Sequence, residues 1–184
     1  MLNSKSLIKI SAGLILVSTI GFSGKAHAQS ATVNSIGSAS NSCTINASTA
    51  GVLVKSGTLA AMEGSAGVSG FGVGNAGTAT VNCTNGGSLT VAAPAPVGAV
   101  PMGFAPAVLQ SVVQRGGNTN PADFTSTSTG GPFDTNAWTK PTTPLAIPVG
   151  VSALKVAMVA GTQTNGPVPS GAYNYSVTLT VTPN

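Results

Sequence analysis

Charged side chains are scarce in this chain. Of its 184 residues, Lys and Arg account for 7 and Asp and Glu for 3. Three of the lysines lie within the first 25 residues, and beyond them four cations face three carboxylates, a net charge of +1. Those four cations are far apart in the sequence: Lys55, Arg115, Lys140 and Lys155. Because binding to nucleic acids and to anionic membranes depends on clustered Lys and Arg, we expect neither.

Catalytic side chains are equally few. The single histidine, His27, lies in a segment that we expect to be removed, and the carboxylates are Glu63, Asp123 and Asp134. Asp123 and Asp134 could serve as the acid pair of a glycosidase, but both lie in a Pro/Ser/Thr-rich stretch, where Asp usually forms turns. The glycine-rich stretch 64–77 is not followed by the helix that makes such loops bind phosphate. We therefore predict no enzymatic activity, no cofactor and no metal site.

The N-terminus has the pattern of a secretory signal peptide. Lys5 and Lys9 precede an apolar run over residues 10–22, and the small residues Ala26 and Ala28 follow it. This order of zones is typical of cleavage after Ala28. The rival interpretation is a membrane anchor, but a run of thirteen residues is shorter than the roughly twenty that a spanning helix needs. We expect an exported chain with no membrane insertion after the signal is removed.

The two cysteines, Cys43 and Cys83, are predicted to form a disulfide. An even number of cysteines in an exported chain is typical of structural bridges. Two thiolates without histidine rarely hold zinc, and neither cysteine has a neighbouring base that would favour redox chemistry.

The end of the chain shows the clearest strand pattern. Apolar or aromatic residues alternate with Asn, Ser and Thr over residues 173–182. Such a period of two is typical of a strand with one buried and one exposed face. We expect the side that faces a core or groove to consist of Tyr173, Tyr175, Val177, Leu179 and Val181.

Other short strands are expected along the chain, and no convincing helix. Residues 78–83 and 88–93 are joined by Asn85-Gly86-Gly87, a sequence that favours a hairpin. Residues 154–160 form another candidate, with Lys155 on its outer face. Weaker candidates are 42–47, 52–54 and 144–149. Short strands separated by turn residues predict an antiparallel β-sandwich or barrel.

Prolines dominate residues 94–144. Proline cannot donate to a β-ladder, so we expect edge strand and long surface loop here, with residues 107–114 as one strand and 125–131 as a low-complexity run. The single tryptophan, Trp138, lies in this region. We interpret it as a core residue beneath the loop rather than as an exposed ligand platform.

Several of these features together resemble the spore-coat-protein-U-like and Csu-type pilin subunits of chaperone–usher systems. The shared features are the signal peptide, the roughly forty-residue spacing of the cysteines and a glycine-rich interval between them. The matching sequences are Cys43-Thr44-Ile45, Ala-Thr-Val-Asn-Cys-Thr-Asn-Gly at 79–86, and the terminal Gly-Ala-Tyr-Asn-Tyr-Ser-Val-Thr-Leu-Thr-Val-Thr at 171–182. The resemblance covers residues 29–93 and the last fifteen.

The resemblance implies an all-β fold, an immunoglobulin-like antiparallel β-sandwich that is pilin-like, lacks its final strand and carries one disulfide. Residues 1–28 would be the signal peptide, 29–42 an N-terminal extension and 43–184 the sandwich. In such subunits a periplasmic chaperone fills the groove left by the missing strand. At the usher, the extension of another subunit, self or sibling, replaces it as a donor strand. The corresponding donor face in this chain is Ala31, Val33, Ser35, Gly37 and Ala39.

The function that follows is a non-enzymatic structural subunit of a surface pilus or coat, secreted through the periplasm to an extracellular fibre. Two alternatives remain open. The chain could be a secreted or surface-bound adhesin whose 94–144 loops contact a ligand. It could also be a self-complete envelope β-sandwich that does not polymerise.

Overall fold

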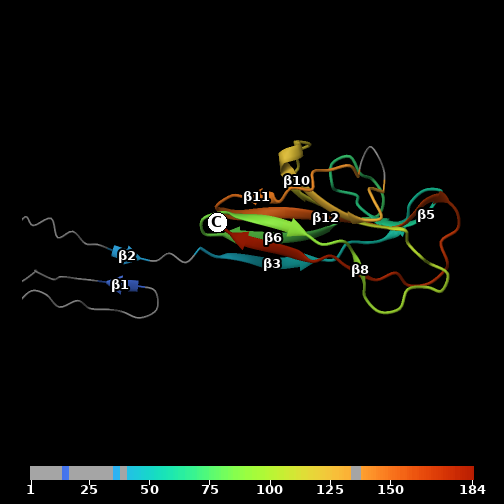
Figure 1. Cartoon of the computed structure of the whole chain (residues 1–184), viewed down its shortest axis with the longest axis horizontal. Coiled ribbons are helices and arrows are strands. Elements are labelled where there is room, and N and C mark those ends of the chain that lie inside the picture. The colour runs from blue at the N-terminus through green and yellow to red at the C-terminus, as the bar shows by residue number, and fades with distance from the viewer. Residues whose placement is uncertain (1–13, 17–34, 38–40, 134–137) are drawn as a thin grey trace, which may run out of the picture. The chain divides into compact units, whose positions relative to one another are not determined.

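The computed structural model describes residues 14–16, 35–37, 41–133 and 138–184 (Figure 1). The chain divides into two units, Met1–Ser40 and Asn41–Asn184. In the first unit, strand β1 (Leu14–Leu16) pairs antiparallel with β2 (Ser35–Gly37). All further elements belong to the second unit.

A seven-stranded sheet is built around the long strand β12 (Gly150–Asn165). On one side β12 pairs with β9 (Val108–Arg115), whose other edge pairs with β10 (Phe124–Thr129). On its other side β12 pairs first with β6 (Gly77–Cys83) and then with β5 (Leu59–Gly64). β3 (Cys43–Thr49) pairs with β6, and β4 (Val54–Lys55) pairs with β5.

A second, three-stranded sheet has β7 (Gly87–Val91) at its centre, between β11 (Leu145–Ile147) and β14 (Leu179–Pro183). The two-residue strands β8 (Ala95–Pro96) and β13 (Tyr175–Ser176) pair separately. A short 3₁₀ helix, η1 (Pro121–Asp123), precedes β10. Every strand pair is antiparallel, and the Cys43–Cys83 disulfide is formed. The predicted all-β antiparallel fold with one disulfide is thus confirmed.

The main core lies between the two sheets. Its buried residues include Val81, Leu89, Val113, Leu145 and Leu154, which come from strands of both sheets. Inward and outward side chains alternate along β6 and β7, as the period of two requires.

A second cluster covers the opposite face of the large sheet. Ala157 and Val159 of β12 pack there with Trp138, Phe124 and other residues. Trp138 is 2% exposed and meets the ring of Phe71 edge-on, with centroids 4.7 Å apart. The interpretation of Trp138 as a core residue is confirmed. Residues 157–161 of β12 are consequently buried on both faces.

The predicted hairpin through Asn85-Gly86-Gly87 is wrong. The turn exists, and Gly86 adopts a positive φ of 79°, but β6 and β7 belong to different sheets. Both edges of β6 are already occupied at Cys83, by Cys43 of β3 and by Gly150 of β12. The chain therefore crosses from one sheet to the other at this turn.

The expectations for the proline-rich region need a second correction. The strand expected at 107–114 is β9, and it lies inside the sheet between β10 and β12 rather than at an edge. Part of the low-complexity run forms the edge strand β10. Residues 124–129 pair with β9 in an unbroken register, so hydroxyl-rich residues here form a regular strand. On the other edge of β10 the Ser126 N–H donates to the Pro141 carbonyl at 2.8 Å.

Candidate functional site

β14 is the last strand of its sheet and has one free edge among the described residues. The Ala92 N–H donates to the Thr178 carbonyl at 2.9 Å, and the Asn184 N–H donates to the Gly86 carbonyl at 3.2 Å. Because bonded residues alternate in an antiparallel pair, the even-numbered residues are the ones that bond toward β7. The backbone groups of Leu179 and Val181 therefore point away from β7, toward the free edge.

β3 pairs only with β6 among the described residues, so its other edge is free as well. The Thr84 N–H donates to the Ser42 carbonyl at 2.9 Å, so by the same alternation Cys43 and Ile45 direct their backbone groups away from β6. Ile45 lies opposite Val81, which is 0% exposed, yet Ile45 itself is 41% exposed. Residues opposite each other in a pair share a face of the sheet. Ile45 thus points to the core side without being covered there.

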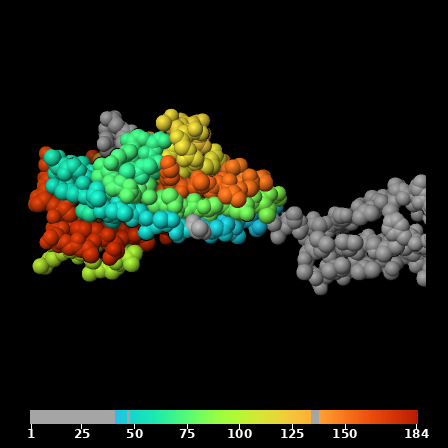
Figure 2. Space-filling view, turned by 180° about the vertical axis from the view of Figure 1, so that it is seen from behind, coloured from blue at the N-terminus to red at the C-terminus, as the bar shows by residue number. Residues whose placement is uncertain are grey.

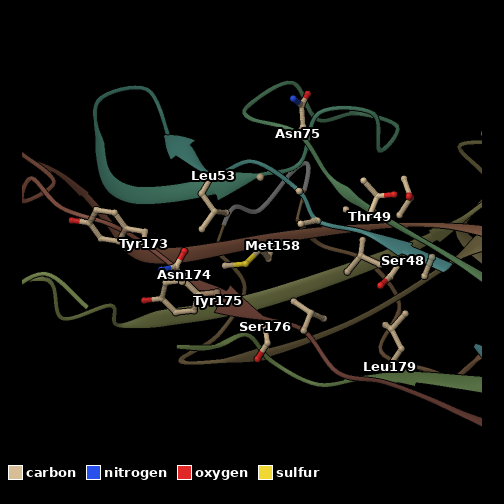
Figure 3. Close-up of a pocket in the computed structure, with 18 residues that line it drawn as sticks. Ser48, Thr49, Leu53, Asn75, Met158, Tyr173, Asn174, Tyr175, Ser176 and Leu179 are labelled. Atoms are coloured by element: carbon tan, nitrogen blue, oxygen red, sulfur yellow. The ribbon is translucent and has the colours of Figure 1, made fainter. Parts of the chain in front are cut away.

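A groove of about 500 Å³ lies between these two edges. Ser48 and Thr49 border it on the β3 side and Leu179 on the β14 side, while Met158 of β12 lines it near Leu53 and Tyr175 (Figure 3). The described residues that line it carry no ionisable group except two tyrosines. They are Ser48, Thr49, Ala50, Gly51, Leu53, Gly64, Asn75, Gly77, Thr78, Ala79, Val156, Met158, Tyr173, Asn174, Tyr175, Ser176, Val177 and Leu179.

The two tyrosines lie at one end of the groove (Figure 3). The Tyr173 hydroxyl donates to the Pro169 carbonyl, and its ring meets Phe104 edge-on at 4.8 Å. The Tyr175 hydroxyl is buried and has no hydrogen-bond partner among the described residues. Burial raises the pKa of both phenols above 10.0, and Tyr173 raises that of Tyr175 further. Both are therefore neutral at physiological pH.

Near the disulfide, β3 and β14 approach each other, since Cys43 Sγ and the Thr182 carbonyl both lie close to Gly87. Some Cα atoms of β3 and β14 lie within 8 Å of each other. β14 lies beside β3 in Figure 1, and in Figure 2 the red part of the chain borders the cyan part that holds β3. Asn41 Nδ2 donates to the Asn184 carbonyl, and Asn85 Nδ2 donates to Asn41 Oδ1. These contacts hold the end of the chain against the start of β3 at this end.

This arrangement suits the binding of an extended peptide. Two free sheet edges offer backbone donors and acceptors, and the apolar floor offers space for side chains. No group of three or more metal-ligating side chains is found among the described residues. Asp123, one of the two carboxylates considered as a glycosidase acid pair, forms an ion pair with Arg115, with 2.6 Å between Oδ1 and the guanidinium nitrogen. Asp134, the other, lies outside the described residues.

The structure places the predicted site residues as follows. Tyr173, Tyr175, Val177 and Leu179 line the groove, and all are half-buried. The expected continuous strand is divided into β13 and β14, which pair with different strands.

Val181 packs in the main core and does not border the groove. Ser35 and Gly37 lie in β2, whereas Ala31, Val33 and Ala39 and the cleavage residues Ala26 and Ala28 lie outside the described residues.

Sequence reasoning missed the floor and the second wall of the groove. Leu53 belongs to a segment expected as a weak strand, and Met158 to the strand expected over residues 154–160 with Lys155 on its outer face. Nothing in their local sequence distinguishes them from other core residues, because the groove arises where two edges lack a neighbour.

No helix formed by the described residues is long and apolar enough to span a membrane. Comparison with protein families, with characterised proteins and with solved structures finds nothing that matches this chain.

Proposed function

We propose that this protein is a non-enzymatic structural subunit of a surface pilus or coat, which polymerises by donor-strand exchange after chaperone-assisted export. The observation that carries the proposal is the groove with a free sheet edge on each side. Leu179, which lines the groove, directs its backbone groups away from its own sheet, and β3 borders the groove on the other side through Ser48 and Thr49. An added strand would pair with either edge.

The physical reason for strand addition is that free edges and uncovered apolar side chains both favour it. Backbone hydrogen bonds to the added strand provide affinity, and alternate side chains enter the groove. Val177 and Leu179 are half-buried although they face the core side. Covering them would remove apolar surface from water, which stabilises by roughly 25 cal/mol per Å².

The occupants follow from the order of export. A periplasmic chaperone would cover the groove first, and at the usher the 29–42 segment of another subunit, self or sibling, would replace it. That segment immediately precedes β3 and is uncharged, in keeping with a groove whose lining is uncharged at neutral pH. Secretion to the cell surface is part of the same proposal.

The test is gel electrophoresis of sheared surface material, with and without boiling, probed for this protein. We expect a heat-sensitive ladder that is lost when residues 30–41 are deleted. The substitution Val177→Phe should also abolish it, because a larger ring would occupy the groove. The matched control is Thr178→Phe, at a neighbouring exposed position, which should leave the ladder intact.

A single band near the monomer mass in every lane would overturn the proposal and leave a self-complete secreted sandwich. A ladder that persists in both the deletion and Val177→Phe would show assembly by another surface. Trp138 fluorescence of the purified variants would show whether each is folded, since this single tryptophan is buried.

A further inference from the structure

We infer that the groove accepts a strand from a different chain, one that carries several large apolar side chains, rather than the N-terminal segment of a second copy. The inference rests on the proposed function and concerns the partner at that same site. It follows from comparing the space in the groove with the side chains that residues 29–42 can offer.

The groove is large because one of its walls is made of small residues. Ser48, Ala50, Gly51 and Gly77 line it on the side of β3 and β6, and the larger Leu53 and Met158 do not fill it. Its volume is about 500 Å³. A cavity of about 150 Å³ holds a benzene molecule, so this groove has room for about three groups of that size.

The segment 29–42 cannot supply such a set. Its apolar residues larger than alanine are Val33 and Ile36. They are three positions apart, and in an extended strand residues an odd number of positions apart point to opposite faces. In any register, therefore, one of the two would enter the groove and the other would point away from it.

The remaining inward side chains would leave most of the groove unfilled. With Val33 inward, its neighbours on that face are Ala31, Ser35, Gly37 and Ala39. Unfilled space beside apolar groups forfeits both contacts and burial. A strand with large apolar residues at three or more alternating positions, and no charge on that face, would fill the groove instead.

The experiment compares three labelled synthetic peptides for binding to the full chain by fluorescence anisotropy. The first is the sequence of residues 29–42. The second carries Ala31→Leu and Ser35→Leu, which place three large apolar residues on one face together with Val33. The matched control carries Asn34→Leu and Ser35→Leu, which add the same number of leucines but leave two large residues on each face.

We expect the second peptide to bind at least about tenfold more tightly than the first and more tightly than the control. Equal binding of the first and second peptides would overturn this inference while leaving strand addition intact. Equal binding of the second peptide and the control would also overturn it. Affinity would then depend on the number of large apolar residues and not on their position on one face of the strand.

A different result would count against the proposed function itself. If none of the peptides binds, or if binding is unchanged in Val177→Phe, the groove does not accept a strand. Thr178→Phe should bind like the unaltered chain, and Trp138 fluorescence checks that both variants are folded.

Discussion

Loss of the Cys43–Cys83 disulfide should strongly destabilise the domain. The bridge joins β3 to β6 at paired positions and closes a loop with a sequence separation of 40. In the loop-entropy account, opening a loop of this length stabilises the unfolded chain by about 4 kcal/mol. Since small domains unfold with a free energy of about 5–15 kcal/mol, the variant Cys43→Ala/Cys83→Ala should retain a small part of the original stability.

The assay is urea unfolding followed by the fluorescence of Trp138. This residue is buried in the second cluster, on the face of the large sheet opposite the main core, and not beside the disulfide. With a slope of about 2 kcal/mol/M, the midpoint should fall by about 2 M. The wild-type chain measured in reductant should match the double variant. A fall of less than about 0.5 M, or about 1 kcal/mol at that slope, would refute the argument that the bridge acts by constraining the unfolded loop.

Three further predictions concern packing, hydrogen bonding and titration. Gly161→Ala should cost about 3 kcal/mol, because the new Cβ would lie 2.3 Å from Ala61 Cα, whereas Gly117→Ala meets nothing within 4 Å; equal urea midpoints for the two variants would contradict this. Ser56→Ala removes a 2.7 Å hydrogen bond to the buried Glu63 carboxylate and should lower stability by about 1–3 kcal/mol, while the exposed Ser170→Ala should not change the melting temperature. Burial raises the pKa of Tyr173 and Tyr175 in the folded chain, so the unfolded chain releases these protons first and stability should fall as the pH rises above 10.0. Spectrophotometric titration should give a higher midpoint for the native chain than for the chain in urea, and coincident curves would be evidence against this burial.

The sequence predicts the parts of this fold that depend on local pattern. The alternation over 173–182 marks the terminal strands because a period of two is visible without knowing any partner. The disulfide follows from two cysteines in a chain with a signal-peptide pattern. By contrast, Asn85-Gly86-Gly87 specifies a turn but not which strands pair across it. The choice is made by β3 and β12, which already occupy both edges of β6.

The sequence does indicate that part of β12 is buried on both faces, although we interpreted this strand as one with a single buried face. Val156-Ala157-Met158-Val159-Ala160 is a continuous apolar run, typical of a strand covered on both faces. The groove had no such signal. In the sequence, Leu53 and Met158 look like ordinary core residues. Whether a strand edge is free depends on which strands pair in the folded chain, and the local sequence does not show this.

The two clusters on β12 explain how a groove can stay open in a folded domain. Met158 and Ala160 face the side of the groove, and the alternating Ala157 and Val159 are buried on the other face under Trp138. The sheet beneath the groove is therefore held from behind by a packed aromatic cluster. Its strands keep their positions without contacts from an added strand, so the apolar floor and both free edges are already in place before any strand arrives.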